Sequence, residues 1–153
     1  MSTMTDPNIF SPIWDLERDE PPFHWRRAYL GRQSGSDKLG ASLFEVAPGG
    51  ETFPIHIHHA NEEMMVVLVG TPTLVTPDGE RVLEAGAVVA CLAGREGAHG
   101  LRNDTNQPVR LIVVSTMLAP EINEFPETGE IWVRDYAPGQ DPASGKLDVR
   151  FTP

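Results

Sequence analysis

Residues 50–70 read GETFPIHIHHANEEMMVVLVG, and this stretch decides both the fold and the chemistry that we expect of the chain. If the first half is a strand, alternation places the side chains of His56 and His58 on the same face. A glutamate pair ending at Glu63 follows at once, before an apolar run with the composition and length of a strand, which a glycine closes. If the two strands pair as a hairpin, a glutamate lies beside two imidazoles, a recurring arrangement for holding a divalent transition metal.

The same stretch resembles the first sequence motif of the cupin superfamily. Its five fixed positions are matched with the family's spacing by Gly50, His56, His58, Glu63 and Gly70. The resemblance implies an all-β fold, the double-stranded β-helix or jelly-roll barrel. It also implies that His56, His58 and Glu63 are metal ligands inside that barrel.

A second stretch, across a variable segment, resembles the other motif of the family. Its positions are occupied by Gly86, Gly94, His99 and Asn103, and the resemblance implies that His99 is the fourth metal ligand. The sequence departs from the family pattern twice. Leu92 stands where proline is usual, and the gap from Gly94 to His99 is two residues longer than the commonest form. Within the superfamily the chain most resembles small single-domain bacterial conserved-barrel cupins, some of which carry provisional sugar-phosphate isomerase names.

Length and composition indicate one globular domain. The 153 residues are enough for a real core, and a hydrophobic content of 40% is ordinary for such a protein. No apolar run approaches a membrane span, and the polar first ten residues do not resemble a signal peptide. The only cysteine, Cys91, excludes an intrachain disulfide and fits a reducing compartment, so we expect a cytoplasmic protein. The formal charge of -10 argues against nucleic-acid and membrane partners, but not against a small anionic substrate.

Short strands separated by turn signals predict an all-β architecture, and no long segment shows the 3.6-residue period of a helix. We expect an extended N-terminal arm over residues 1–22, a barrel domain over residues 23–137 and a C-terminal tail over residues 138–153. The expected strands cover residues 23–30, 38–47, 52–58, 63–69, 72–75, 81–83, 88–92, 98–102, 111–117 and 130–136.

Each predicted ligand has a simpler alternative. His56 and His58 could be polar strand residues that face solvent, with their isoleucine neighbours facing the core, because alternation alone cannot choose between the faces. Glu62 competes with Glu63, since neighbouring strand residues face opposite ways, and the spacing to the following glycine selects Glu63. His99 could be an ordinary loop histidine.

The other polar and reactive residues have structural explanations. His59 faces away from the predicted site if the strand continues, and His24 is a surface or packed strand residue. Asn103 closes a turn, and Cys91 is a small buried residue. On strict alternation, Met65 shares the face of the site glutamate and lines the cavity.

Three imidazoles and one carboxylate leave up to two positions open on a six-coordinate ion, and this donor set suits one divalent Fe, Mn, Ni, Co or Zn ion per chain. With Fe or Mn, the open positions permit dioxygenase chemistry on a small organic molecule. With Zn, Ni or Mn, the ion acts as a Lewis acid in isomerase or lyase chemistry, which needs a base nearby. Glu45 and Tyr29 are bases that the sequence cannot place.

Two alternatives to an enzyme stay open at this point. The barrel could sense or store a small molecule without turnover, with the metal as an anchor. The ion could also be purely structural, in which case protein ligands would close its shell. The family resemblance further implies a homodimer, for which Ile13, Trp14 and Trp132 are the expected contacts.

Overall fold

The computed structural model describes residues 6–153, and almost all of its regular structure is β-strand. The helical elements of this part are one short helix, α1 (Leu30–Ser34), and two 3-10 turns, Arg95–Gly97 and Pro142–Ser144. The strands are β1 (Leu16–Glu20), β2 (Phe23–Ala28), β3 (Leu39–Val46), β4 (Ile57–His58), β5 (Glu63–Val69), β6 (Thr73–Thr76), β7 (Gly79–Val82), β8 (Val88–Cys91), β9 (Gly100–Arg102), β10 (Val109–Thr116), β11 (Glu121–Phe125), β12 (Glu130–Arg134) and β13 (Asp148–Phe151).

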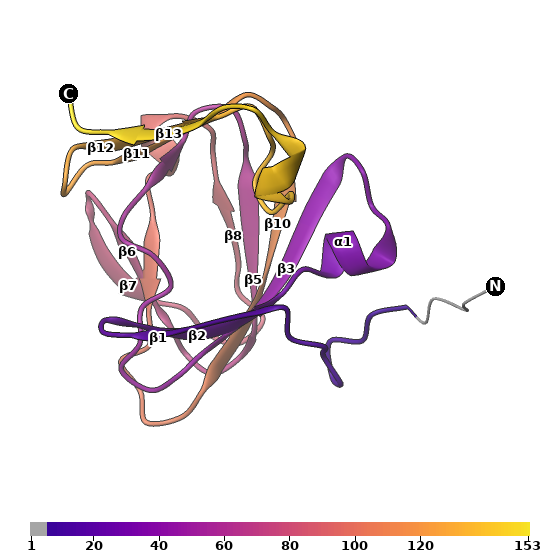
Figure 1. Cartoon of the computed structure of the whole chain (residues 1–153). Coiled ribbons are helices and arrows are strands. Elements are labelled where there is room, and N and C mark those ends of the chain that lie inside the picture. Colours follow the sequence, from indigo (N-terminus) through magenta and orange to yellow (C-terminus); the bar gives the residue numbers. More distant parts are fainter. Residues whose placement is uncertain (1–5) are drawn as a thin grey trace.

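The strands form three antiparallel sheets that curl round a common interior (Figure 1). The orders are β1-β2-β3-β10-β5-β8 in the largest sheet, β13-β12-β11-β4 in the second and β7-β6-β9 in the third. Isolated bridges add further links, one of them between His56 and His99. Many neighbouring strands are distant in the sequence, as they are in a jelly roll. The prediction of an all-β jelly-roll barrel is confirmed.

Strand alternation fills the interior with apolar side chains. Leu111 of β10 lies between Phe44 of β3 and Val67 of β5, and all three are buried. Each such side chain contributes about 1.5–3 kcal/mol to stability. Trp25, Phe44 and Phe53 add an aromatic cluster with ring centroids 5.3 to 6.0 Å apart. This packing fixes the strand register, because a slip by one residue would turn the apolar side chains outward.

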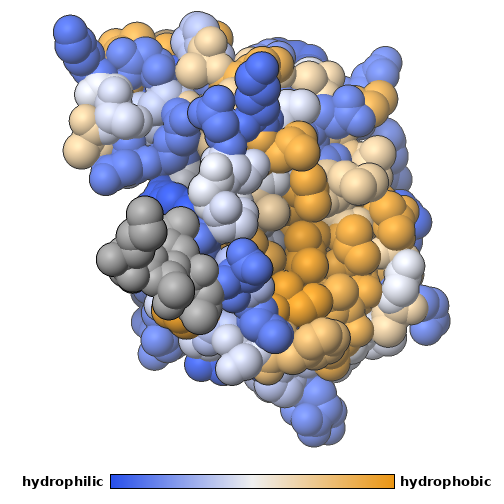
Figure 2. Space-filling model, turned by 90° about the vertical axis from the view of Figure 1, so that its right-hand side faces the viewer, coloured by the Kyte–Doolittle hydropathy of each residue, from blue (hydrophilic) through white to orange (hydrophobic). Residues whose placement is uncertain are grey.

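The outer face of the largest sheet is apolar as well, and Figure 2 shows it as a broad hydrophobic area. The N-terminal arm covers one part, because Trp14 packs against the buried cluster that includes Leu43. Further along the same face, Leu39, Met64 and Val88 are exposed. The outside of the barrel therefore carries an apolar surface that no element of residues 6–153 covers.

Three strands and the α-helix were not expected from the sequence, namely β1, β11, β13 and α1. β1 lies within the predicted arm, whose first five residues fall outside the described part, and β13 lies within the predicted tail. Both strands extend a sheet by pairing at its edge, β1 with β2 and β13 with β12. α1 ends at Gly35, which adopts the left-handed conformation with φ 77°. Within residues 6–153, no helix is long and apolar enough to cross a membrane.

The strand that carries His58 is shorter than expected and pairs elsewhere. It spans two residues and pairs with β11, whereas β5 lies between β10 and β8. The expected hairpin between these two segments is therefore wrong. Pro54 lacks a backbone N–H and sits in a bend before β4. After β4, the fully buried Asn61 bonds to both backbone groups of Leu118 and holds the chain as it crosses to the other sheet.

Candidate metal centre

Three histidines and one glutamate from separate segments meet inside the barrel. His58 lies on β4, Glu63 opens β5, and His56 and His99 immediately precede β4 and β9. Oε2 of Glu63 lies 3.5 Å from Nε2 of His58 and 3.2 Å from Nε2 of His99. The ring of His56 lies 5.0 Å from that of His58 and 4.5 Å from that of His99, measured between centroids. The donor atoms of His56, His58 and Glu63 all lie within 4.8 Å of one another, and His99 joins this group through its contact with Glu63. The structure thus brings together the four residues that the sequence selected, while Glu62 is exposed.

Backbone carbonyl groups orient two of the imidazoles. Nδ1 of His56 lies 3.0 Å from the carbonyl oxygen of Pro54, and Nδ1 of His99 lies 2.8 Å from that of Gly97. A carbonyl oxygen only accepts hydrogen bonds, so each Nδ1 carries the proton and donates it. In the neutral rings Nε2 therefore keeps its lone pair, which is the atom that a metal ion would bind.

Glu121 orients the third imidazole. Its fully buried carboxylate lies 3.1 Å from Nδ1 of His58 and also accepts from Nδ2 of Asn61. The backbone N–H groups of Ala60 and Ile122 donate to it as well, at 3.1 and 3.0 Å. Burial alone would raise the pKa of Glu121, but the hydrogen bonds from His58 and Asn61 outweigh burial and lower it. A carboxylate behind a metal-facing imidazole is a typical outer layer of a metal site.

The electrostatics of the cluster favour a positive charge beside Glu63. Burial would raise the pKa of Glu63, but His58 and His99 outweigh burial and hold it well below its usual range. Burial, together with His99 and His58, lowers the pKa of His56 to about 3. Burial also opposes protonation of His99, but contacts with Cys91 and Glu63 dominate and raise its pKa to about 10. The cluster therefore favours one cation next to an ionised carboxylate, and its nitrogen and oxygen donors fit a divalent transition metal.

A tight loop positions His99 and accounts for the unusual spacing of the second motif. The longer gap contains the 3-10 turn Arg95–Gly97, after which the chain returns to the cavity. The N–H of Gly94 donates to the backbone of β4 at 2.7 Å and ties the loop to that strand. A Cβ at Gly97 would lie 1.7 Å from the carbonyl oxygen of Leu92, so only glycine fits there.

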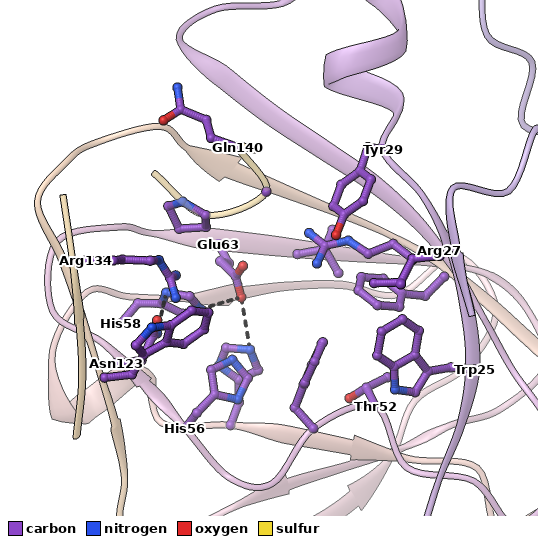
Figure 3. A pocket seen from close by; sticks show the side chains of 18 of the residues that line it. Trp25, Arg27, Tyr29, Thr52, His56, His58, Glu63, Asn123, Arg134 and Gln140 are labelled. Atoms are coloured by element: carbon purple, nitrogen blue, oxygen red, sulfur yellow. Dashed lines mark hydrogen bonds and ion pairs between the residues drawn. The ribbon is translucent and has the colours of Figure 1, made fainter. Parts of the chain in front are cut away.

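A cavity of about 430 Å³ lies over the four residues (Figure 3). Its walls include polar side chains from β2, β11 and β12, among them Arg27, Asn123 and Arg134. Met65 also lines it, which confirms the alternation argument for that residue. The volume lies within the range of small-molecule binding sites.

Three other residues singled out in the sequence lie outside this centre. His59 is exposed and lies 3.1 Å from the carboxylate of Glu124, and Nδ1 of His24 lies 2.7 Å from that of Asp19. Asn103 is buried and donates to two backbone carbonyls around its turn, as predicted for a residue that closes a turn.

The structure separates the two bases that the sequence could not place. Tyr29 lines the cavity. Glu45 lies outside it and accepts hydrogen bonds from Arg26 at 2.9 Å and Arg110 at 2.6 Å. Trp132, an expected dimer contact, lines the cavity instead of the outer sheet face.

Sequence reasoning missed the polar residues of β2, β11 and β12. Arg27, Asn123 and Arg134 line the cavity, and Glu121 supports an imidazole. In a sequence, a charged residue on a strand is most simply explained as facing solvent. The sequence offered one usable signal for a buried charge. Arg134 directly follows the apolar run of residues 131–133, and an apolar run indicates a buried strand.

Comparisons with known proteins agree with this architecture. A family model described as the cupin domain matches residues 42–115. The structure of a sugar phosphate isomerase of the cupin superfamily from Silicibacter pomeroyi is 25% identical, with a TM-score of 0.74 over 84% of this chain and 76% of that chain. A protein from Acidithiobacillus ferrooxidans, provisionally named a sugar phosphate isomerase, is 24% identical, with a TM-score of 0.72 over 80% and 78%.

A third likeness is more distant in structure. The polyketide cyclase RemF from Streptomyces resistomycificus is 29% identical, with a TM-score of 0.54 over 60% of this chain and 64% of that chain. No curated protein sequence matches the chain significantly. Taken together, the family model, the jelly-roll topology and the likeness to a solved member of the cupin superfamily show that the chain contains a cupin domain.

Proposed function

We propose that this protein is a metal-dependent enzyme that acts on a small organic molecule by isomerase- or lyase-type chemistry. One divalent ion (Fe, Mn, Ni or Zn) would be held by His56, His58, Glu63 and His99. The observation that carries the proposal is the convergence of these four side chains on the cavity, with every imidazole oriented through its own Nδ1 contact. A purely structural ion usually has a closed shell of protein ligands, whereas this cluster opens onto a cavity.

Tyr29 is the residue that we assign to proton transfer. The guanidinium groups of Arg27 and Arg32 each lie 4.3 Å from the centroid of its ring, and Figure 3 shows its hydroxyl turned into the cavity. A bound divalent ion would supply Lewis acidity that polarises a substrate carbonyl. Tyr29 would donate a proton to the substrate oxygen or remove one from it. The likeness to a sugar phosphate isomerase supports this class of chemistry.

Elemental analysis of protein purified without chelators and under low oxygen tests the metal centre. We expect about one equivalent of metal per chain in the wild-type protein, because the four donors define a single site. Glu63→Gln and His99→Ala should lose that equivalent. His59→Ala should keep it, since that exposed histidine points away from the cluster. Equal loading in all four proteins would refute the assignment.

Turnover by the metal-loaded protein tests the reaction class. We expect isomerisation or cleavage of a substrate from a panel of hydroxy-carbonyl compounds, with Tyr29→Phe lowering kcat by roughly 10²–10⁴ at unchanged metal content. Oxygen consumption with bound Fe would instead indicate a dioxygenase. Ligand binding without turnover would indicate a binding or sensing protein.

A homodimer through the apolar outer face of the largest sheet belongs to the same proposal. Exposed Leu39, Met64 and Val88 on this face would become buried against a second copy, and large exposed apolar patches mark interaction sites. Light scattering after size exclusion should give twice the chain mass. Val88→Glu should give the monomer mass. Val82→Glu, which replaces an equally apolar and exposed residue on β7, should keep the dimer mass.

A further inference from the structure

Three of the four arginines that line the cavity form no ion pair within residues 6–153, whereas most arginines elsewhere in this part of the chain do. The fourth, Arg150, pairs with Glu130 at 3.0 Å. Of residues 6–153, Arg27, Arg32, Arg81 and Arg134 form no ion pair, and all but Arg81 line the cavity. The chain has 22 acidic residues and a net charge of -10, so partners are not scarce. The arginines that do pair with carboxylates are Arg18, Arg26, Arg95, Arg102, Arg110 and Arg150.

Arg134, the last residue of β12, is deeply buried and incompletely bonded. Only 3% of its surface is exposed, and its Nε and Nη1 atoms have no hydrogen-bond partner in the part of the chain that the structure describes. Its guanidinium lies 3.7 Å from the ring centroid of Trp132, a contact that does not occupy the N–H groups. Its cross-strand neighbour Glu121 makes no ion pair with it, because that carboxylate already accepts four other hydrogen bonds. A buried charge left in this state is costly unless a partner arrives.

Arg27, on β2, is the second cavity arginine that forms no ion pair within residues 6–153. Its Nε donates to the hydroxyl of Ser42 at 3.0 Å, and its guanidinium packs over the rings of Tyr29 and Phe44, at 4.3 and 4.9 Å from their centroids. None of these partners is an anion. Arg26, the preceding residue on the same strand, points the other way and pairs with a carboxylate outside the barrel. The two neighbours therefore differ. Arg26 is paired outside the barrel, whereas Arg27 faces a cavity whose carboxylates, Glu63 and Asp148, form no ion pair with it.

We propose that Arg27 and Arg134 form a subsite that binds a carboxylate or phosphate group of the substrate, beside the metal centre. The substrate class is then a small organic oxyanion. Figure 3 shows the two side chains entering the cavity from opposite sides of the view, with Glu63 between them. Guanidinium groups present paired N–H donors that match two oxygens of either anion. Trp25, whose Nε1 has no hydrogen-bond partner within residues 6–153, also lines the cavity, on the side of Arg27.

This subsite deepens the proposed function and rests on it for the role of the histidine cluster. The anionic group would anchor the substrate at the arginines, so that the reacting part of the molecule faces His56, His58 and Glu63. The overall negative charge of the chain does not prevent this, because the nearest charges set the field inside a cavity with low-dielectric walls.

Calorimetric titration with inorganic phosphate and with malonate tests the subsite. The metal-loaded full-length protein is compared with Arg27→Met, Arg134→Met and Arg81→Met, the last being a matched loss of one exposed, unpaired arginine on β7. We expect at least one of the two anions to bind, and both cavity variants to weaken that binding by roughly tenfold or more. Arg81→Met should bind like the wild type. Preference for phosphate or for malonate identifies which anionic group the substrate carries.

Repeating the titrations after removal of the metal separates this inference from the proposed function. If the protein binds no metal but the arginine variants still weaken anion binding, the metal centre is refuted and the subsite stands. If anions bind only to the metal-loaded protein, with the same affinity in both cavity variants, the subsite is refuted. The subsite is also refuted if neither anion binds, or if only one of the two arginine substitutions weakens binding. If Arg134→Met does not fold, Arg134→Lys replaces it. Lysine keeps the positive charge but lacks the paired N–H donors of a guanidinium, so we expect Arg134→Lys to weaken anion binding as well.

Discussion

The backbones of His56 and His99 exchange two hydrogen bonds, of 3.0 and 3.1 Å, although the two residues belong to different sequence motifs. This isolated bridge sets their rings 4.5 Å apart, centroid to centroid, before any metal ion is considered. The spacing of two predicted ligands is therefore fixed by the main chain, and their orientation by the Nδ1 contacts. A preorganised site of this kind binds an ion without having to order its side chains first.

The loop before His99 gives the first prediction. Gly97→Ala should weaken metal binding at least tenfold, because the new methyl group would displace the chain from the Leu92 carbonyl and move His99 with it. Competition with a chelator measures the affinity. Gly35→Ala is the control, since that glycine has positive φ but open space around it. The two variants should both lose some stability, but only Gly97→Ala should lose affinity.

The outer carboxylate gives the second prediction. Glu121→Gln should reduce metal affinity by about 10- to 100-fold, because an amide cannot accept from His58 and Asn61 as a carboxylate does. The matched control is Glu124→Gln, which removes the carboxylate beside the exposed His59. Equal affinities for the two variants, measured in the same chelator competition, would show that Glu121 plays no part in tuning the site.

Proton release accompanies metal binding in the third prediction. The pKa of His99 is raised to about 10, so this ring is protonated at pH 8 in the metal-free protein, whereas His56, with its pKa lowered to about 3, is already neutral. A metal ion displaces the proton, so about one proton should leave per ion and affinity should rise with pH between 7 and 10. Calorimetry in buffers of different ionisation enthalpy counts the protons. A count of zero at pH 8 would contradict the raised pKa of His99 in the metal-free protein.

Glu45 gives a prediction about stability rather than function. Burial would raise its pKa, but hydrogen bonds from Arg110 and Arg26 outweigh burial and lower it. A lowered folded-state pKa stabilises the fold above the unfolded-state value of 4.5, and this contribution is lost as pH falls through the folded-state pKa. Glu45→Gln should therefore cost about 1 kcal/mol at pH 7 and much less near pH 3. Urea unfolding at both pH values measures the difference, and an equal cost at both would contradict the linkage.

The sequence alone predicted most of the barrel, because its strands carry their own signals. The β-branched run that became β10 and the Pro77-Asp-Gly-Glu80 turn between β6 and β7 are local patterns, and the structure follows them. β11 and β13 were missed because at least half of the residues in each are polar or charged. These two strands form by pairing with β12, and pairing between distant segments leaves little trace in the composition of a single strand.

For the candidate site too, the sequence selected the residues, and the tertiary structure decided how they come together. Motif spacing selected the four side chains that converge, and the assignment of those side chains as ligands stays a prediction until metal is measured. The hairpin that should have brought Glu63 to the histidines does not exist. Their approach results from the crossing between two sheets, which Asn61 holds, and from the bridge between His56 and His99.

By itself, the sequence determined an all-β architecture and the order of most strands, because alternation and turn signals are local. Its resemblance to two cupin motifs implied the jelly roll and the identity of the four convergent residues. Only the tertiary structure decided what surrounds them. Glu121 behind His58 and the unpaired Arg27 and Arg134 in the cavity wall became visible when β2, β11 and β12 closed round the interior. The physical reason is that a charged side chain on a strand has the same local pattern whether it faces water or a cavity, and its meaning depends on which charges the fold leaves beside it.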